Sequence, residues 1–426
     1  MFAQLLKENL DTGVNMIRTS HRLIKTVMPH PKAIKALEYL KTIEPPNMQN
    51  YLPVLWKRAR DASVWDEFGN KFIDFTSAIF VTNSGHGRIA GNLIKQAQEL
   101  IHCYTFPSEV RVRFLKILSQ FLPTFCDKIY LASAGSEVTS WALKCMRSID
   151  PNRQIIISFT GAFHGKTGDI AKLETEEIKL PEPISVEDWE NHIKLIEPYK
   201  DKICGVIIES YQGWSGKFLP EEYVQKLVTY CHQNNIAVCF DEIQAGFYRT
   251  GKRFAYEWYN VNPDLLCLGK ALGGGYPLSA LVGRAKYFNV AGMSSTHSAT
   301  PLACAVGYGI ICSYDKTNLT LLTDKSTFLN EYLRELQAEY PDMIEAVNSR
   351  GLLAGVIFKD FSKGLAKEIA DEVCWKCMQN GLLLVHTGKR SVKIGPPLNI
   401  NKYALVEGLE VLEKVIREVY NVCKSN

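Results

Sequence analysis

Five short apolar segments each end close to residues that could bind a ligand or take part in catalysis. The segments are Lys128–Leu131, Gln154–Ser158, Gly205–Ile208, Ile236–Phe240 and Leu265–Leu268. The groups that follow them, in the same order, are Gly135 with Ser136, Phe163 with His164, Glu209, Asp241 and Lys270. Mostly apolar runs of this length are typical of buried parallel strands. Because ligands of open α/β sheets bind beyond the carboxyl ends of the strands, we expect these groups to meet.

The lysine and the aspartate are the candidate catalytic residues. A charged Lys270 just after a buried strand is costly, and Schiff-base formation would remove the charge while using the amine as a nucleophile. Asp241 could pair with a cationic ring nitrogen, since a buried carboxylate needs a partner. The alternatives are a loop lysine whose ammonium reaches solvent and an aspartate that caps the next turn.

A candidate anion site lies where Ala132–Glu137 leads into the helical run Val138–Arg147. Free N–H groups at a helix N-terminus bind anions, and Gly135 would let a phosphate approach closely. Ordinary strand-to-helix turns also use glycine and serine, so this turn is a weak signal when taken alone.

The chain has 426 residues, which favours two domains. From about residue 90, short β-rich runs alternate with helical stretches, which predicts an α/β domain with a mostly parallel, doubly wound sheet over residues 85–320. Residues 1–84 and 321–426 are expected to form a smaller α+β domain. The elements expected there are a peripheral helix in the first forty-odd residues, a hairpin of Ser63–Trp65 with Lys71–Phe75, strands at Leu352–Phe358 and Leu382–Val385, and helices at Leu365–Gln379 and Tyr403–Val422.

The composition excludes several classes of function. The net charge of +4 is small and no long basic block occurs, so neither a nucleic acid nor a membrane surface is an expected partner. The N-terminus lacks the apolar stretch of a signal peptide, which favours a cytoplasmic protein. Cys374 and Cys377 have the spacing of a redox motif, but no second such pair completes a metal site. They lie in an expected amphipathic helix, so packing is favoured over redox or metal chemistry, and no metal is predicted.

Three stretches together resemble the signature of class III, or ω-type, aminotransferases, which are fold-type I pyridoxal-phosphate enzymes. The stretches are Asp241–Lys252, Pro263-Asp264 and Gly269–Pro277. The likeness continues through Gly85-His86, Ala134–Glu137, Phe163–Gly165, Glu209 with Gln212-Gly213, and Thr300–Ala305. It therefore covers the chain from about Leu52 to Ile400.

The resemblance implies a role for each matching residue. Lys270 would form the Schiff base with pyridoxal 5'-phosphate and move the proton, while Asp241 would keep the pyridine nitrogen protonated. The other implied cofactor contacts are Phe163 and Ile243 on the two ring faces, Gln244 at the phenolic oxygen with Glu209 nearby, Gly135 and Ser136 at the phosphate, and His164 beside Phe163. Thr296 would reach the phosphate of a neighbouring subunit, which implies a homodimer with shared active sites.

Two positions depart from the family pattern. Lys393 stands where the resemblance implies an arginine that binds the substrate α-carboxylate, and a lysine cannot hold a carboxylate bidentately. Trp214 stands where glutamate-using members carry a glutamate. Both departures argue against a standard glutamate or ornithine enzyme. Lys393 either binds a carboxylate or phosphate or faces solvent; Trp214, Phe80 and Tyr248 either line an aromatic substrate pocket or pack in the core.

The sequence predicts an aminotransferase that moves an amino group between a primary amine or amino acid and an aldehyde or keto acid by a ping-pong mechanism. An aminomutase, a racemase or a phospho-lyase would share the same motifs and stays an alternative. A binding protein without catalysis is disfavoured because Lys270 and Asp241 are both present. A nucleotide-binding enzyme is disfavoured because both the GxGxxG turn and the P-loop motif are missing.

Overall fold

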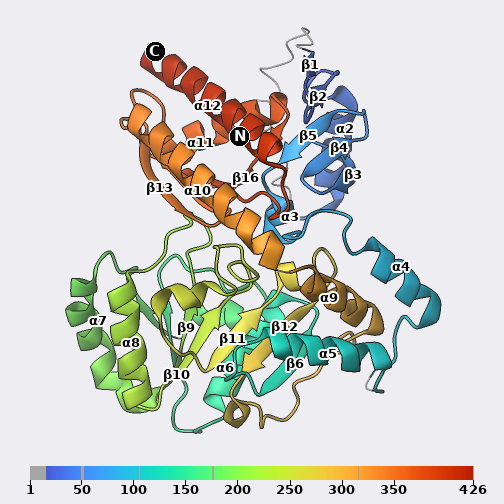
Figure 1. The fold of residues 1–426 in the computed structure, drawn as a ribbon. Helices are drawn as coiled ribbons and strands as arrows, with labels where there is room; N and C mark the ends of the chain where they lie inside the picture. Colours follow the sequence, from blue (N-terminus) through green and yellow to red (C-terminus); the bar gives the residue numbers. More distant parts are fainter. Residues whose placement is uncertain (1–15, 49–51, 105, 175–176, 315, 426) are drawn as a thin grey trace.

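The largest sheet lies at the centre of one half of the molecule (Figure 1). The computed structural model describes residues 16–48, 52–104, 106–174, 177–314 and 316–425, and within them this sheet has seven strands in the order β6-β12-β11-β10-β9-β7-β8. The strands are β6 (Lys128–Ala132), β7 (Ile155–Phe159), β8 (Ile178–Leu180), β9 (Ile203–Glu209), β10 (Ala237–Asp241), β11 (Leu265–Leu268) and β12 (Ser279–Gly283). Only β12 runs antiparallel to its neighbours, so the predicted mostly parallel sheet is confirmed.

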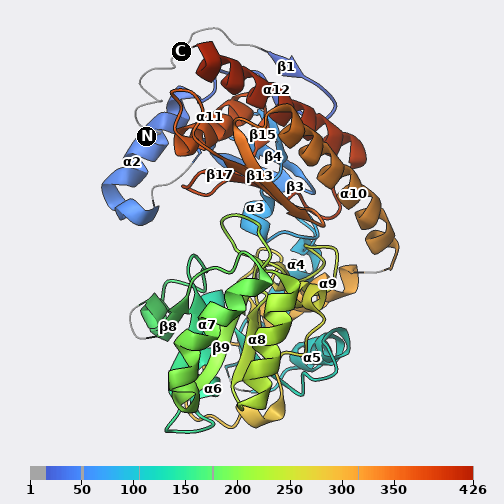
Figure 2. The ribbon, with the colours of Figure 1, turned by 90° about the vertical axis from the view of Figure 1, so that its left-hand side faces the viewer.

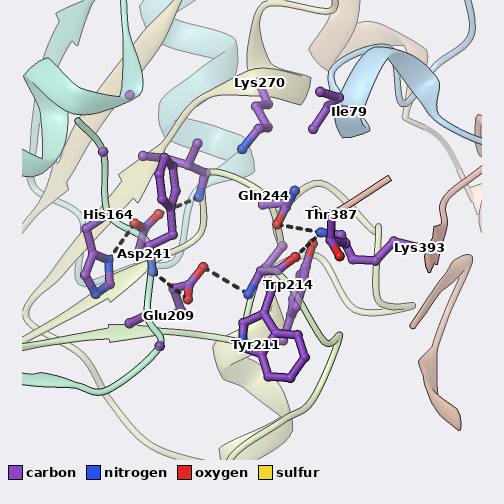
Figure 3. A pocket seen from close by; sticks show the side chains of 18 of the residues that line it. Ile79, His164, Glu209, Tyr211, Trp214, Asp241, Gln244, Lys270, Thr387 and Lys393 are labelled. Carbon is purple, nitrogen blue, oxygen red and sulfur yellow. Dashed lines mark hydrogen bonds and ion pairs between the residues drawn. The ribbon is translucent and has the colours of Figure 1, made fainter. Parts of the chain in front are cut away.

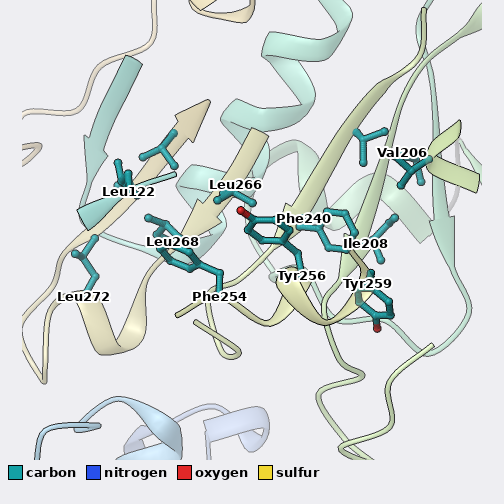
Figure 4. Close-up of a cluster of buried hydrophobic side chains, with 14 of the residues drawn as sticks. Leu122, Val206, Ile208, Phe240, Phe254, Tyr256, Tyr259, Leu266, Leu268 and Leu272 are labelled. Atoms are coloured by element: carbon teal, nitrogen blue, oxygen red, sulfur yellow. The ribbon is translucent and has the colours of Figure 1, made fainter. Parts of the chain in front are cut away.

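Apolar side chains are buried on both faces of the sheet. Successive side chains of a strand point to opposite faces, so each strand contributes to both. Cys239 and Cys267 pack on one face together with Leu143 of helix α6 (Gly135–Arg147). Phe240 and Leu268, the next residues along, belong to the cluster on the other face, which includes residues of α8 (Glu221–Gln233) (Figure 4). Burying a large apolar side chain contributes about 1.5–3 kcal/mol, which explains why these strands read as continuous apolar runs.

Both ends of the chain contribute to the second half of the molecule (Figures 1 and 2). One sheet has the order β13-β14-β17-β16 and is built from β13 (Ile344–Arg350), β14 (Leu353–Phe358), β16 (Val385–His386) and β17 (Ser391–Ile394). The other runs β1-β2-β5-β4-β3 and is built from β1 (Ile17–Arg18), β2 (Leu23–Ile24), β3 (Trp56–Arg60), β4 (Ser63–Asp66) and β5 (Lys71–Asp74). β15 (Leu382–Leu383) pairs in parallel with β5, which joins the C-terminal part to the N-terminal sheet.

The helices cover these sheets. They are α2 (Pro31–Ile43), α3 (Ser77–Phe80), α4 (Ala90–Glu99), α5 (Glu109–Phe121), α7 (Trp189–Ile196), α9 (Pro301–Ser313), α10 (Lys316–Glu339), α11 (Ala366–Gln379) and α12 (Lys402–Ser425), besides α6 and α8. None of the helices in the described ranges is long and apolar enough to cross a membrane.

Separate apolar clusters occupy the two halves. The cluster on the α8 side of the large sheet draws its buried members from residues 114–311, and the main cluster of the other half draws them from residues 62–75 and 322–419. The domain boundaries expected after residues 84 and 320 stay a prediction, and they fall between the members of these clusters.

Several elements differ from the sequence-based expectation. The first forty-odd residues were expected to be helical; β1 and β2 precede α2 there, and residues 1–15 lie outside the described part. The expected strand Leu382–Val385 is divided between β15 and β16, which belong to different sheets. Strands β3, β8 and β12 were not predicted, because such short strands are stabilised mainly by their partners.

Candidate active site

A cavity of about 730 Å³ lies at the carboxyl ends of the large sheet, and residues of both halves line it. Most of the residues singled out in the sequence meet there (Figure 3). Those lining the cavity are Gly135, Ser136, Phe163, His164, Glu209, Trp214, Asp241, Ile243, Gln244, Lys270 and Lys393. Phe80 and Thr296 are not among its lining residues.

Strand pairing explains why these groups converge. Asp241 and Glu209 are directly opposite each other on the adjacent parallel strands β10 and β9. Lys270 lies two residues beyond the end of β11, which pairs with β10 on its other side. In Figure 3 the side chains of Lys270 and Asp241 come from different strand ends and border the same space. The sheet therefore brings an amine and two carboxylates to one edge.

The Asp241 carboxylate accepts hydrogen bonds from two donors and has lone pairs free for a third donor. Its Oδ1 accepts a hydrogen bond from the Ile243 N–H at 3.1 Å, and its Oδ2 lies 2.9 Å from Nδ1 of His164. Asp241 is 6% exposed, so a cationic ligand atom that reached it would meet a strongly desolvated carboxylate. Nε2 of His164 is buried and has no hydrogen-bond partner among the described residues.

Lys270 is largely buried at the start of the short 3₁₀ helix Lys270–Leu272, and its φ of 41° lies in the left-handed region. Such a backbone is strained for a residue other than glycine and is typical of functional sites. Burial lowers the pKa of Lys270, although the nearby carboxylates of Asp241 and Glu209 act in the opposite direction. A larger share of the amine is therefore neutral, which is the nucleophilic form.

The start of α6 has free N–H groups at the place where the sequence predicts an anion site. The Glu137 carboxylate accepts hydrogen bonds from the N–H groups of Ser133 at 2.8 Å and Ala134 at 3.0 Å. The N–H groups of Gly135 and Ser136 follow in the first turn, where no intrahelical acceptor exists, so an anion could take them. A Cβ on Gly165 would lie 2.5 Å from Oγ of Ser136, so this wall leaves room only for glycine.

These three parts fit pyridoxal phosphate. The amine of Lys270 suits its aldehyde, the carboxylate of Asp241 suits its protonated ring nitrogen, and the start of α6 suits its phosphate. They belong to one cavity whose volume lies in the usual range for ligand sites.

A hydrogen-bonded chain connects the large sheet to Lys393 on β17. Oε2 of Glu209 accepts from the Phe163 N–H at 3.0 Å, and its Oε1 accepts from the Gly213 N–H at 3.2 Å. Lys393 donates to the Gly213 carbonyl oxygen and, at 3.3 Å, to Oε1 of Gln244. Burial raises the pKa of Glu209 to about 7. Burial, reinforced by the charge of Lys270, lowers the pKa of Lys393 to about 7.

Two predicted residues lie outside the cavity wall. Phe80 is fully buried, and its ring lies 4.5 Å from Nζ of Lys393, so it supports that lysine from behind. The Thr296 carbonyl oxygen accepts a hydrogen bond from Nε2 of His102 at 2.9 Å, on a surface loop. Tyr248, which the sequence offered as a pocket residue, packs against Phe121 and Tyr314 instead.

Sequence reasoning missed several lining residues. Tyr211 lies two residues beyond β9, so the strand-end rule could have found it; its hydroxyl is buried without a hydrogen-bond partner among the described residues. His386, Thr387 and Lys389 belong to the β16–β17 hairpin, and no local signal reveals that this hairpin lies against the large sheet. Ile79 is 56% exposed at the rim and lies in the left-handed turn α3.

Comparisons with known proteins agree with this geometry. The sequence model of the family described as Aminotransferase class-III matches residues 44–416. The chain is 32% identical to the mitochondrial acetylornithine aminotransferase of Yarrowia lipolytica, with 89% of this chain and 96% of that protein covered. It is also 32% identical to the succinylornithine transaminase of Yersinia enterocolitica, with 86% of this chain and 93% of that protein covered.

Solved structures are similar over the same extent. The crystal structure of acetylornithine aminotransferase from Elizabethkingia anophelis matches with a TM-score of 0.78 and 27% identity, covering 91% of this chain and 99% of that one. The ornithine δ-aminotransferase of Plasmodium falciparum also matches with a TM-score of 0.78, at 26% identity and the same coverage.

The position of Asp241 leads to a testable prediction. Asp241→Asn should weaken the binding of pyridoxal phosphate and slow turnover by about 1,000-fold or more, because an amide cannot stabilise a cationic ring nitrogen. Cofactor absorbance retained after gel filtration and single-turnover rates measure the two effects. Asp264→Asn is the matched control, since Asp264 is a buried aspartate beyond the cavity lining that pairs with Arg284. Equal losses in both variants would contradict the role of Asp241.

Proposed function

Since this chain belongs to the class III aminotransferases, and is therefore a pyridoxal-phosphate-dependent aminotransferase, we propose that it acts on substrates whose carboxylate is bound by Lys393. The sequence-based expectation of amino transfer on fold type I is confirmed by the family match and by relatives named as aminotransferases. The aminomutase, racemase and phospho-lyase alternatives have no counterpart among the relatives reported above. The single observation that carries the proposal is a buried lysine of the small domain whose amine lines the cavity.

Asp241 and Lys270 have different roles in the reaction. Pyridoxal phosphate, when bound, supplies an aldehyde that takes the amino group and a ring that absorbs the electron pair left on the substrate carbon. Asp241 holds a proton at the ring nitrogen, which makes the ring a better electron acceptor. Lys270 would hold the aldehyde of the cofactor, and its neutral amine would accept the proton that leaves the substrate carbon. Its lowered pKa favours the neutral amine that this step needs.

Lys393 is suited to a carboxylate for two reasons. An ammonium has three N–H donors, and its contacts with Gly213 and Gln244 use two of them, which leaves one for a substrate oxygen. Lys393 is 3% exposed, and a carboxylate would supply the opposite charge that a buried cation needs. Trp214 also lines the cavity and contributes an apolar surface for the substrate chain. The relatives' substrates named above, ornithine and its acyl derivatives, carry a carboxylate as well.

We further propose that two copies form a homodimer with shared active sites. The support is a run of exposed apolar side chains from α4 to the start of α5, in which Ile94 is 60%, Ile101 58% and Phe106 72% exposed. Exposed apolar patches of this kind mark protein interfaces. His102 of the same run bonds the carbonyl of Thr296, so the residue expected to reach the second active site lies next to this surface.

A cytoplasmic location is also proposed. All twelve cysteines are free, and most are buried, which suits a reducing compartment. The mitochondrial names of the yeast relatives describe those proteins, and a mitochondrial matrix would meet the same condition.

The role of Lys393 predicts a pH dependence. Because the pKa of Lys393 is lowered to about 7, its ammonium is present at lower pH and is lost as the pH rises through that value. The KM for a keto acid should therefore rise above neutral pH, by up to about 10-fold per unit. Lys393→Met should raise this KM by about 10–100-fold at pH 6.5 while sparing neutral amines, and Lys393→Arg should remove the pH dependence. Steady-state kinetics across pH measures these effects.

The matched control is Lys389→Met, because Lys389 is an exposed lysine at the rim of the same cavity. Its KM for the keto acid should keep the wild-type pH profile. If Lys393→Met affects keto acids and neutral amines equally, Lys393 does not bind the carboxylate.

The proposed interface predicts the behaviour of Phe106→Asp. A charge in the centre of an apolar interface is costly to bury, so the variant should elute as a monomer and retain less cofactor. Size-exclusion chromatography with light scattering measures the mass, and absorbance measures the cofactor. Tyr403→Asp is the control, since Tyr403 is 75% exposed on α12, away from α4 and α5. A dimer that survives Phe106→Asp with full cofactor would refute this interface.

A further inference from the structure

We propose that Lys393 is also a positioning residue for Gln244, so that carboxylate binding at Lys393 changes the contact between Gln244 and the cofactor's phenolic oxygen. This inference rests on the proposed function and adds a coupling to it: the group that binds the substrate carboxylate also orients a residue of the cofactor site. In Figure 3 a dashed line joins the side chains of Lys393 and Gln244.

The chemistry of the two side chains fixes the orientation of the amide. A lysine amine at the end of its chain donates hydrogen bonds, so Gln244 must present its carbonyl oxygen Oε1 to Nζ of Lys393, as it does at 3.3 Å. The NH₂ group of Gln244 then occupies the opposite side of the amide. That group is the donor that a phenolic oxygen requires, so the contact with Lys393 selects the useful rotamer.

Gly213 makes this arrangement tight. Its carbonyl oxygen accepts from Lys393, and its N–H donates to Glu209. A Cβ at Gly213 would lie 2.9 Å from Oε1 of Glu209 and 3.1 Å from Oε1 of Gln244, so both side chains close in on this residue. Lys393, Gln244 and Glu209 thus meet around one residue, Gly213, so a movement of Lys393 also affects Gln244.

The charges around Lys393 make it responsive to an anion. Lys270, Glu209 and Arg249 all act on it, and two of the three are cations. Phe80 and Tyr211 present ring faces to it at 4.5 Å and 5.9 Å, which help a cation only weakly. Among the described residues, Lys393 has hydrogen-bond acceptors but no ion pair, so a bound carboxylate would be the anion in direct contact with it. When one binds, one of its oxygens takes the free N–H of Lys393 and its other oxygen competes with Oε1 of Gln244 for a second N–H.

The coupling has a direction that can be measured. An N–H donated by Gln244 to the phenolic oxygen withdraws negative charge from it, which lowers the proton affinity at the nitrogen of Lys270. If a carboxylate draws Lys393 away from Gln244, the hydrogen bond from Gln244 to the phenolic oxygen weakens. The proton affinity at the nitrogen of Lys270 then rises. The pH midpoint of the bound cofactor's visible absorbance reports this change without any turnover.

The experiment titrates the holoenzyme with and without propionate, a carboxylate that has neither an amine nor a carbonyl to react. Saturating propionate should raise the midpoint of wild type by about one pH unit. It should leave the midpoint of Lys393→Met unchanged, whereas Lys393→Arg should restore the response. In Gln244→Met, propionate should still compete with the keto acid. It should shift the midpoint by less than half of the wild-type shift, because only the electrostatic effect of the propionate charge itself remains.

The outcomes separate the coupling from the proposed function. If propionate competes with the keto acid in wild type but leaves the midpoint unchanged, or shifts it equally in wild type and Gln244→Met, the coupling is refuted while Lys393 stays a carboxylate site. If propionate inhibits wild type and Lys393→Met equally, the carboxylate site itself is wrong and the coupling falls with it. Lys226→Met, a change at an exposed lysine of α8 outside the cavity lining, should respond as wild type does.

Discussion

The central constraint of this structure is a carboxylate buried at the end of a central strand. Taking the charge of Asp241 out of water costs several kcal/mol, and the contacts from His164 and the Ile243 N–H offset only part of that cost. A cationic ring nitrogen of the bound cofactor would offset the rest. The sheet must therefore hold Asp241 rigidly and keep a ring-sized space open in front of it. The apolar clusters on both faces of the sheet hold the strand that carries Asp241, and the cavity lies in front of it.

The amine of Lys270 lies in the same environment of low polarity, which disfavours its charged form. Burial favours the neutral form of a lysine and the protonated form of a carboxylate, so one environment lowers the pKa of Lys270 and raises that of Glu209. The second half of the molecule adds Lys393 to the far side of the same space. The strand-end groups and the proposed carboxylate site at Lys393 thus come from different halves of the molecule, and Gly213 connects them.

The sequence predicted the parts of the site that depend on local order. Strands such as Ile236–Phe240 are apolar throughout because both faces are covered, and the residue after the strand is then placed at the sheet edge by geometry alone. The α6 turn is similarly local. The hairpin with His386 and Lys389 could not be predicted, because its place against the large sheet depends on pairing between β17 and β14. The sequence left Phe80 open between a substrate pocket and core packing, because the pattern does not show which way an aromatic side chain faces. The structure buries it behind Lys393.

The most direct test of the account asks which lysine carries the cofactor. Reduction of the purified holoenzyme with borohydride fixes pyridoxal phosphate to its lysine, and mass mapping of the peptides then identifies the residue. The account predicts the adduct on the peptide that contains Lys270. An adduct on Lys393, a second buried lysine of the same cavity, or a reduced protein with no adduct would contradict it.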